Sequence, residues 1–285
     1  MIKVVGITFK DVGKIYWFSP NVYDIHPGDK VVVETARGTE LGLVTIGPKE
    51  IAEAELEHEL KSVIRIANKY DIKNYNENKE KSQKALVACE KIIRKHKLEM
   101  KLLDCEYTLD KQKIIIYYNA EGRVDFRELL KDLASEFRVR IELRQVGPRE
   151  GAKFIGGLGC CGREVCCKSH LREFDLVTMK MAKDQGMSLN AAKIAGICGK
   201  LMCCIGYENS VYEEIRARIP LQGDIVNTPT TKNCKVINVD ILAEMCTVSD
   251  KDDKVTVWPA SELIKVSTNY KEEITAADLS DDVID

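Results

Sequence analysis

The sequence predicts an α+β protein made of several small units that follow one another along the chain. Short runs of β-branched and apolar residues, separated by glycine and proline turn signals, occupy both ends of the sequence. Between them, the order helix, strand, strand, helix, strand is typical of a compact α+β layer. Cysteines concentrate after that layer. We therefore expect a small N-terminal β-barrel, a central ferredoxin-like α/β layer, a cysteine-rich metal module and a C-terminal small β unit.

The predicted boundaries follow these changes of pattern, because a chain of 285 residues is long enough for two or three small domains. The predicted units are an N-terminal small β domain (1–66), an α+β layer (67–155), a cysteine-rich metal-binding module (156–210), a C-terminal β unit (211–268) and an acidic tail (269–285).

Composition places the protein among soluble globular chains, with 45% hydrophobic and 31% charged residues. No apolar run approaches the roughly 18 residues that suggest a membrane span. Lys3 and Lys10 interrupt the first apolar residues, so the N-terminus is a predicted strand rather than a signal peptide. We therefore expect a cytoplasmic protein whose cysteines serve metal binding or redox chemistry rather than disulfides. The formal net charge of −2 gives no general argument for nucleic-acid binding.

The N-terminal domain is predicted from short strands with turn signals between them. Residues 2–9 and 15–18 flank a first turn, and further turns lead into strands over 30–35 and 41–45. This spacing is typical of a small barrel.

The central layer is predicted from a change of hydrophobic period. Residues 71–100 form a predicted amphipathic helix, followed by an alternating strand over 103–109 and its hairpin partner over 113–118. Asp125 and Glu128 resemble a capping box at the start of the next helix. A strand over residues 139–144 completes the layer, which is ferredoxin-like if a strand near Val63 joins its sheet. Arg140 and Arg144 share the polar face of that strand, which is either a solvated face or an edge for anions or RNA.

The C-terminal part is predicted to be β-rich after a short helix over residues 207–217. Strands are expected over residues 223–226, 234–239, 246–248 and 254–258. The segments PGDKV, ending at Val31, and QGDIV, ending at Val226, predict the same turn into a strand. Two related β units would then bracket the chain.

Seven of the eleven cysteines lie between residues 156 and 208, and they form a repeat. CGREVCC begins at Cys161 and CGKLMCC begins at Cys198, so a Cys-Gly-basic-x-x-Cys-Cys unit occurs twice. Chance clustering does not place glycines and basic residues at matching offsets. The repeat predicts one thiolate site built from two similar halves. The glycine after each leading cysteine is expected to let the backbone approach a bulky cluster.

A tetrahedral site needs four soft ligands, and the first and last positions of each repeat core supply them as Cys161, Cys166, Cys198 and Cys203. Neighbouring residues project in different directions, so we expect one cysteine of each doublet to face the site, and the sequence leaves open which one. The alternatives are therefore Cys167 and Cys204.

The metal is not decided by the ligands alone. Four residues separate the paired cysteines, at the upper end of zinc spacing, whereas five-residue steps also occur in iron–sulfur proteins, so the spacing favours a cluster over zinc. His170 is a further zinc-type candidate, although Leu171 and Phe174 beside it indicate a packed loop. The lone cysteines are predicted to be core residues, and they are Cys89, Cys105, Cys234 and Cys246.

The chain resembles the bacterial RicT/YaaT family, also called stage-zero sporulation protein, which carries the polymerase-suppressor C-terminal domain. The resemblance rests on YYNAEGRVDFRELLKDLASEFRVRIELRQVGPREGAK, on CGREVCCKSHL and on MAKDQGMSLNAAKIAGICGKLMCC, and it covers about residues 60–210. It implies a cytoplasmic, non-catalytic subunit that assembles with RicA- and RicF-like proteins into a complex carrying 4Fe-4S clusters. It also implies roles in RNA maturation by RNase Y and in sporulation, competence and biofilm formation.

On this resemblance the cluster ligands are Cys161, Cys166 or Cys167, Cys198, and Cys203 or Cys204. Cys160 departs from the expected pattern. The competing hypothesis is a zinc-stabilised RNA-binding adaptor, because the segment from residue 153 to residue 200 contains eight basic and only four acidic residues. RNA contact therefore stays open, although no aromatic stacking set accompanies these charges. An enzyme is not predicted, because no nucleophile–base pair, phosphate loop or carboxylate pair stands out.

Overall fold

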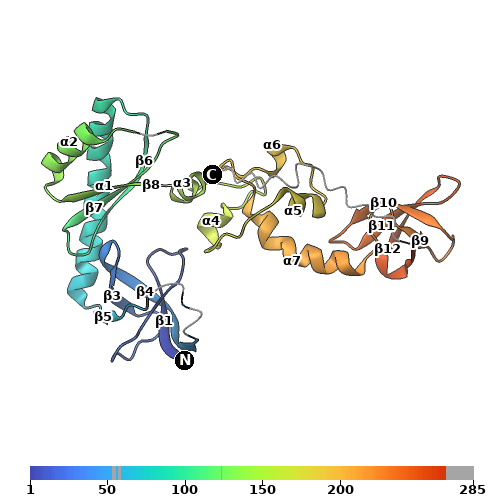
Figure 1. The fold of residues 1–285 in the computed structure, drawn as a ribbon, viewed down its shortest axis with the longest axis horizontal. Coiled ribbons are helices and arrows are strands. Elements are labelled where there is room, and N and C mark those ends of the chain that lie inside the picture. Colours follow the sequence, from blue (N-terminus) through green and yellow to red (C-terminus); the bar gives the residue numbers. More distant parts are fainter. Residues whose placement is uncertain (53–55, 57–58, 123, 268–285) are drawn as a thin grey trace. The chain divides into compact units, whose positions relative to one another are not determined.

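The computed structural model describes residues 1–52, 56, 59–122 and 124–267 (Figure 1). The predicted acidic tail over residues 269–285 lies outside these described residues. The chain divides into two compact units, Met1–Glu173 and Phe174–Asp285, and each is described by itself. Both contain helices and antiparallel strands, as the predicted α+β class requires. Every helix of the described residues is too short or too polar to span a membrane.

The first sheet has five antiparallel strands in the order β2-β1-β4-β3-β5. The strands are β1 Ile2–Thr8, β2 Tyr16–Phe18, β3 Lys30–Thr35, β4 Gly38–Ile51 and β5 Val63–Ile66. The predicted barrel does not close within the described residues. The edge strands β2 and β5 meet only through a single bridge between Ser19 and Ser62, just outside both strands.

The central layer is a three-stranded sheet in the order β6-β7-β8, with α1 and α2 beside it (Figure 1). Its elements are α1 Lys69–His96, β6 Lys101–Tyr107, β7 Lys113–Asn119, α2 Arg127–Phe137 and β8 Arg140–Gln145. Strand β7 pairs with β6 antiparallel and with β8 parallel. The buried core between helices and sheet includes Cys89, Cys105, Ile114, Ile116, Leu129 and Leu133.

The predicted ferredoxin-like sheet is wrong in its fourth strand. The strand that begins at Val63 pairs with β3 of the first sheet, where Ile66 lies opposite Val31. Val31, Val32 and Val33 of β3 are buried, so this pairing completes an apolar strand of the first sheet. The central sheet therefore keeps three strands.

The start of α2 also differs from its prediction. Its N-cap is Phe126, which makes no side-chain capping bond. The Asp125 carboxylate instead accepts hydrogen bonds from the backbone N–H of Arg127 at 3.1 Å and from its guanidinium at 2.6 Å. A charge-assisted contact with the guanidinium competes successfully for this carboxylate. Glu128 pairs with Lys131 at 2.8 Å and takes no part in capping.

A helix that the sequence analysis did not predict, α3 Pro148–Ile155, follows β8. Its signal was present, because proline is favoured at the first position of a helix and Gly147 serves as N-cap. Phe154 of α3 packs against Tyr117 with ring centroids 5.1 Å apart. The helix thus covers the face of the sheet opposite α1 and α2.

The second unit begins with short helices around a small core and ends in a second five-stranded sheet. The helices of the cysteine region are α4 Cys166–Ser169 in the first unit, and α5 Met179–Asp184, α6 Ala191–Ile194 and α7 Cys203–Arg218 in the second. The helix predicted over residues 207–217 thus starts earlier, at Cys203. Ala182, Ile194 and Ile205 are buried together.

The C-terminal sheet has antiparallel strands in the order β12-β11-β10-β9-β13. The strands are β9 Ile225–Asn227, β10 Cys234–Asp240, β11 Met245–Ser249, β12 Val255–Pro259 and β13 Ile264–Ser267. All four strands predicted here are confirmed, and β13 is added at an edge.

The turns that enter β3 and β9 have the same structure. Gly28 and Gly223 have φ of +97° and +94°. The N–H of each donates to the neighbouring strand at 2.8 Å. The Oδ2 atoms of Asp29 and Asp224 accept from the backbone N–H three residues earlier, at 2.8 and 2.9 Å. The predicted relation between these turns is confirmed, and β3 and β9 hold the same place in their sheets.

Candidate metal centre

The first cysteine repeat folds as a tight hairpin that leads into a helix. Gly162 donates its N–H to the carbonyl of Gly159 at 2.9 Å, and Gly159 donates to the carbonyl of Arg163 at 2.8 Å. These bonds place Cys161 within the turn. Cys166 is the first residue of α4. One thiol therefore lies in the turn and the doublet begins the helix.

The second repeat has the same local structure. Gly199 donates its N–H to the carbonyl of Gly196 at 2.9 Å, and Gly196 donates to the carbonyl of Lys200 at 2.8 Å. Cys198 lies in this turn, and Cys203 is the first residue of α7. The sequence repeat is thus a structural repeat, with matching hydrogen bonds at matching positions.

The glycines after the leading cysteines have a conformational reason, and the predicted approach of their backbone to a cluster stays a prediction. Gly162 and Gly199 have φ of +77° and +79°, and a Cβ atom at either would meet no protein atom within 4 Å. Their backbone lies in the left-handed region, which side chains other than glycine adopt at a cost. The turn conformation therefore requires these glycines, and crowding by the protein does not.

The two cysteines of the first doublet lie in different surroundings. Cys167 is buried, with 5% of its surface exposed, whereas Cys166 is half-buried. This difference is the one expected of neighbouring residues on a helix. Cys203 and Cys204 are both half-buried. Cys203 begins a sixteen-residue helix, whose unpaired N–H groups and dipole favour a thiolate there.

The leading cysteines are accessible to a ligand, since Cys161 is exposed and Cys198 is half-buried. Cys160, next to the turn, is also exposed. The first repeat belongs to the first compact unit and the second repeat to the second unit. Among the described residues, no group of three or more His, Cys, Asp or Glu side chains is arranged to hold a metal ion. One site shared by both repeats stays a prediction.

The donor set of each repeat fits a thiolate-bound metal. An accessible thiol in a turn and another at a helix start are soft ligands held by defined backbone, and two such pairs make the four that zinc or a cluster needs. The pair in the first repeat is Cys161 with Cys166, and the pair in the second is Cys198 with Cys203.

The four lone cysteines are buried, which confirms them as core residues. Cys89 and Cys105 lie with their sulfur atoms 4.0 Å apart between α1 and β6. The contact with Cys89 and burial both raise the pKa of the Cys105 thiol. Burial raises the pKa of Cys246 to about 11 and also raises that of Cys234. Neutral buried thiols are poor metal ligands, because the thiolate is the ligand form.

Basic side chains anchor the first repeat within its unit. Arg172 donates from Nη1 to the carbonyl of Gly13 at 3.0 Å, which ties the segment after α4 to the first sheet. The side chain of Lys168 crosses Gly156, where a Cβ atom would lie 2.5 Å from its Nζ. Burial, with Lys10 and Arg172 nearby, lowers the pKa of Lys153. Local sequence patterns do not reveal this anchoring, because Gly13 and Arg172 are far apart in the chain.

His170 is exposed and its Nδ1 lies 2.9 Å from Ser169 Oγ. It directly follows α4, close in sequence to Cys166. It therefore stays an alternative ligand for zinc.

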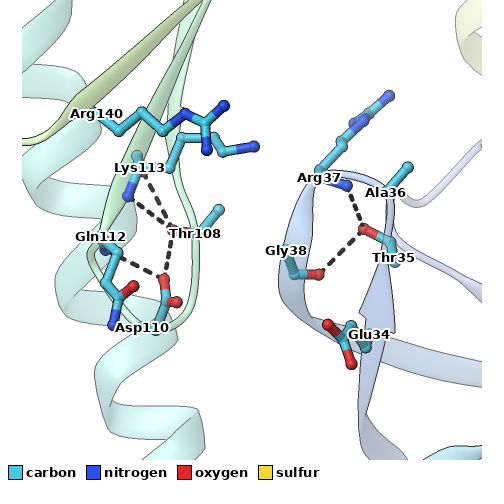
Figure 2. Close-up of a pocket in the computed structure, with 10 residues that line it drawn as sticks. All are labelled: Glu34, Thr35, Ala36, Arg37, Gly38, Thr108, Asp110, Gln112, Lys113 and Arg140. Carbon is cyan, nitrogen blue, oxygen red and sulfur yellow. Dashed lines mark hydrogen bonds between the residues drawn. The ribbon is translucent and has the colours of Figure 1, made fainter.

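A polar pocket of about 370 Å³ lies elsewhere in the first unit, between the β3–β4 and β6–β7 hairpins. Figure 2 shows the side chains of Lys113 and Arg140 extending side by side toward the β3–β4 hairpin. Asp110 accepts a hydrogen bond from Thr108 Oγ1 at 2.6 Å and shapes the turn. Arg140, which the sequence analysis placed on a polar face, lines this pocket. Arg144 instead lies over the ring of Tyr117, 5.9 Å from its centroid.

Comparisons with known proteins match the regions around the cysteines. The family model of the PSP1 C-terminal conserved region matches residues 61–146, and that of the third domain of PSP1-like proteins matches residues 176–219. Stage 0 sporulation protein YaaT of Bacillus subtilis is 45% identical over 266 residues, which are 93% of this chain and 96% of that protein. Protein PSP1 of Saccharomyces cerevisiae is 43% identical over 49 residues, 17% of this chain and 6% of that protein. No solved structure matches the chain.

Proposed function

This chain belongs to the YaaT/PSP1 family, and on that premise we propose that it is a non-catalytic regulatory or scaffold subunit that binds an iron–sulfur cluster. In this proposal it acts with RicA- and RicF-like partners in RNA maturation by RNase Y. The family is sporulation-related, because its curated relative is a stage 0 sporulation protein. Control of sporulation, competence and biofilm formation, and a cytoplasmic location, belong to the same proposal.

The repeated hairpin-and-helix structure of the two cysteine segments is the observation that carries this proposal. Two segments with the same hydrogen bonds each hold a thiol in a turn and another at a helix start. A catalytic role would not require the second copy, whereas a four-thiolate site does.

Within each doublet the first cysteine is the proposed ligand. Cys166 is half-buried while Cys167 is packed inside its unit, so Cys166 is the accessible partner of Cys161. Cys203 holds the matching position at the start of α7. The proposed set is therefore Cys161, Cys166, Cys198 and Cys203, and Cys167 and Cys204 are the alternatives.

A bound cluster would supply a redox-active centre and a cross-link between the two repeats. The chain's own residues would shape it. Arg163 and Lys200 follow the two turn glycines at matching positions, and their charges would offset those of the thiolates and favour the deprotonated form. This role requires only that the side chains reach the thiolates.

A zinc-stabilised RNA-binding adaptor is the second candidate. The same four thiolates satisfy tetrahedral zinc, and a cysteine in a tight turn followed by a helix suits a closed structural site. In that case the metal would hold the fold together and the function would lie in RNA contact by the surrounding surface.

Metal analysis of protein prepared without oxygen separates the two candidates. We expect iron and acid-labile sulfide, with the visible charge-transfer absorption of a cluster, in the protein alone or with its partners. The control is Cys246→Ala, which removes a buried thiol outside the repeats and should cost about 1–3 kcal/mol of stability while leaving the iron content unchanged. Stoichiometric zinc without sulfide would reject the cluster in favour of the zinc adaptor.

A further inference from the structure

Helix α1 carries one buried face and one face of lysines. Its buried residues are Asp71, Asn78, Ser82, Ala85, Cys89 and Ile93. At 3.6 residues per turn, Lys69, Lys73, Lys84 and Lys91 lie on the opposite side of the helix. Since α1 has 28 residues, this side is about 42 Å long at roughly 1.5 Å per residue.

Most acidic groups on α1 are already neutralised by partners. Asp71 pairs with Arg65, Glu77 with Lys111 at 3.1 Å, and Glu90 with Arg94 at 2.7 Å. These pairs leave an excess of lysine charge on the helix surface. Seven exposed lysines have no ion pair within the part of the chain that the structure describes: Lys69, Lys73, Lys79, Lys81, Lys84, Lys91 and Lys97. Four of them, Lys69, Lys73, Lys84 and Lys91, lie on the side of α1 opposite its buried residues, and we call these four the basic face of α1.

Such a concentration of charge is not required for solubility. The whole chain has a formal net charge of −2, so these lysines are gathered on one helix rather than spread through a basic protein. The shape of the face selects among anionic partners. A helix that lies on a membrane needs a broad apolar face, whereas the large exposed apolar side chains of α1 are isolated, namely Tyr70, Tyr75 and Val87.

A row of flexible cations along a straight helix suits a linear polyanion, whose phosphates repeat along its length. The ring of Tyr70, which is 70% exposed, lies at one end of the row and could stack on a base. We propose that the basic face of α1 binds the phosphodiester backbone of RNA without sequence preference. The choice of RNA as the nucleic acid rests on the proposed function. The binding itself requires no metal.

The test compares the full-length protein with a quadruple variant, Lys69→Gln, Lys73→Gln, Lys84→Gln and Lys91→Gln. Glutamine keeps helix propensity while it removes charge. With a labelled single-stranded RNA of mixed sequence, the variant should bind about tenfold or more weakly. The slope of log affinity against log salt should fall by up to about 3, at roughly 0.7 per lost phosphate contact. Circular dichroism should show an unchanged fold.

The matched control neutralises four exposed lysines in and beside the strands of the C-terminal sheet, Lys232, Lys235, Lys251 and Lys254, in the same way. This control should bind RNA like the wild type. Equal losses in both variants, or no RNA binding by the wild type at low salt, would overturn the proposal. Binding of α1 to phosphatidylglycerol vesicles with no RNA binding would assign the face to a membrane surface instead.

Two further measurements complete the test: the effect of a more positive charge balance on RNA binding, and the metal content of the variant. Glu80→Gln removes an exposed carboxylate from the same side of α1 and should strengthen RNA binding by about twofold; weaker binding would contradict the proposal. Iron and sulfide content should be the same in wild type and quadruple variant. If the quadruple variant loses RNA binding and keeps its metal, the result supports RNA binding by the basic face. If the wild-type protein binds RNA and contains no cluster, only the proposed function is refuted.

Discussion

Burial separates the eleven cysteines into groups with different chemistry. The four lone cysteines lie in hydrophobic cores, where the neutral thiol is favoured. Apart from Cys167, the cysteines of the two repeats are half-buried or exposed and lie in turns or at helix starts. A residue's neighbours in the fold thus decide whether its thiol is packed in a core or accessible to a ligand.

Glycine-to-alanine substitutions test the two turns at the same scale. Gly162→Ala and Gly199→Ala should each destabilise the metal-free protein by about 1–2 kcal/mol, because a Cβ atom is disfavoured at φ of +77° and +79°. Urea unfolding of the metal-free variants measures this cost.

Gly147→Ala is the matched control for these turns. Gly147 has a φ of −69° and open space around its Cβ position, so alanine adopts its backbone without strain. Because Gly147 is the N-cap of α3, where alanine is less favoured than glycine, the substitution should cost only about 0.5 kcal/mol. Equal destabilisation at all three glycines would show that the left-handed backbone is not the cause.

At the scale of the element, α1 depends on its first turn. Asn68 accepts hydrogen bonds from the backbone N–H groups of Tyr70 and Asp71, both at 2.9 Å, and Asp71 accepts one from the N–H of Asn68 at 2.8 Å. This capping box supplies acceptors for backbone N–H groups at the start of α1 that have no partner within the helix. The hydrogen bond from Arg65, together with that from the Asn68 N–H, lowers the pKa of Asp71 below its ordinary value.

Asp71→Ala should therefore cost about 1 kcal/mol or more at neutral pH, the typical value of a lost cap. Because the folded-state pKa is lowered, the stability from this carboxylate is fully present above its ordinary pKa of 3.8 and is lost as the pH falls toward the lower folded value. The difference in unfolding free energy between wild type and variant, measured across pH 2 to 7, should shrink below about pH 4. A difference independent of pH would mean that the charge of Asp71 contributes nothing.

Considered as a whole molecule, the chain places one cysteine repeat in each compact unit. A cluster with ligands from both repeats would tie two distant segments of the chain to one metal centre. Because metal-site free energy is folding free energy, such a cluster would make the two repeats fail together.

Single and double variants test this coupling. Cys161→Ser and Cys198→Ser should each abolish metal binding and increase protease cleavage in residues 156–208. The double variant should be little worse, because residues that act as one unit are strongly non-additive. Metal content, proteolysis and partner pull-down should be measured on all three proteins. Half the metal retained in each single variant would show two separate sites.

Local patterns allowed correct predictions wherever the interaction partners are close in sequence. The α+β class, most strands of the two terminal sheets, the hairpin of β6 and β7, the shared turn before β3 and β9, and the repeated cysteine unit were predicted, because periodicity and turn glycines act over a few residues. The closed barrel and the capping role of Asp125 were not correctly predicted, since barrel closure depends on strands far apart in the chain and the Arg127 guanidinium competes for the Asp125 carboxylate.

The sequence by itself determined that the chain contains two copies of one thiol-bearing unit, and it identified the six cysteines of their Cys-Gly-basic-x-x-Cys-Cys cores. Tertiary structure decided that the strand from Val63 joins the first sheet, that Arg172 ties the first repeat to Gly13, and that Cys167 rather than Cys166 is buried. The reason is physical. Each of these outcomes depends on which distant surface lies nearest after folding, and the free energy of burial belongs to that contact rather than to the local sequence.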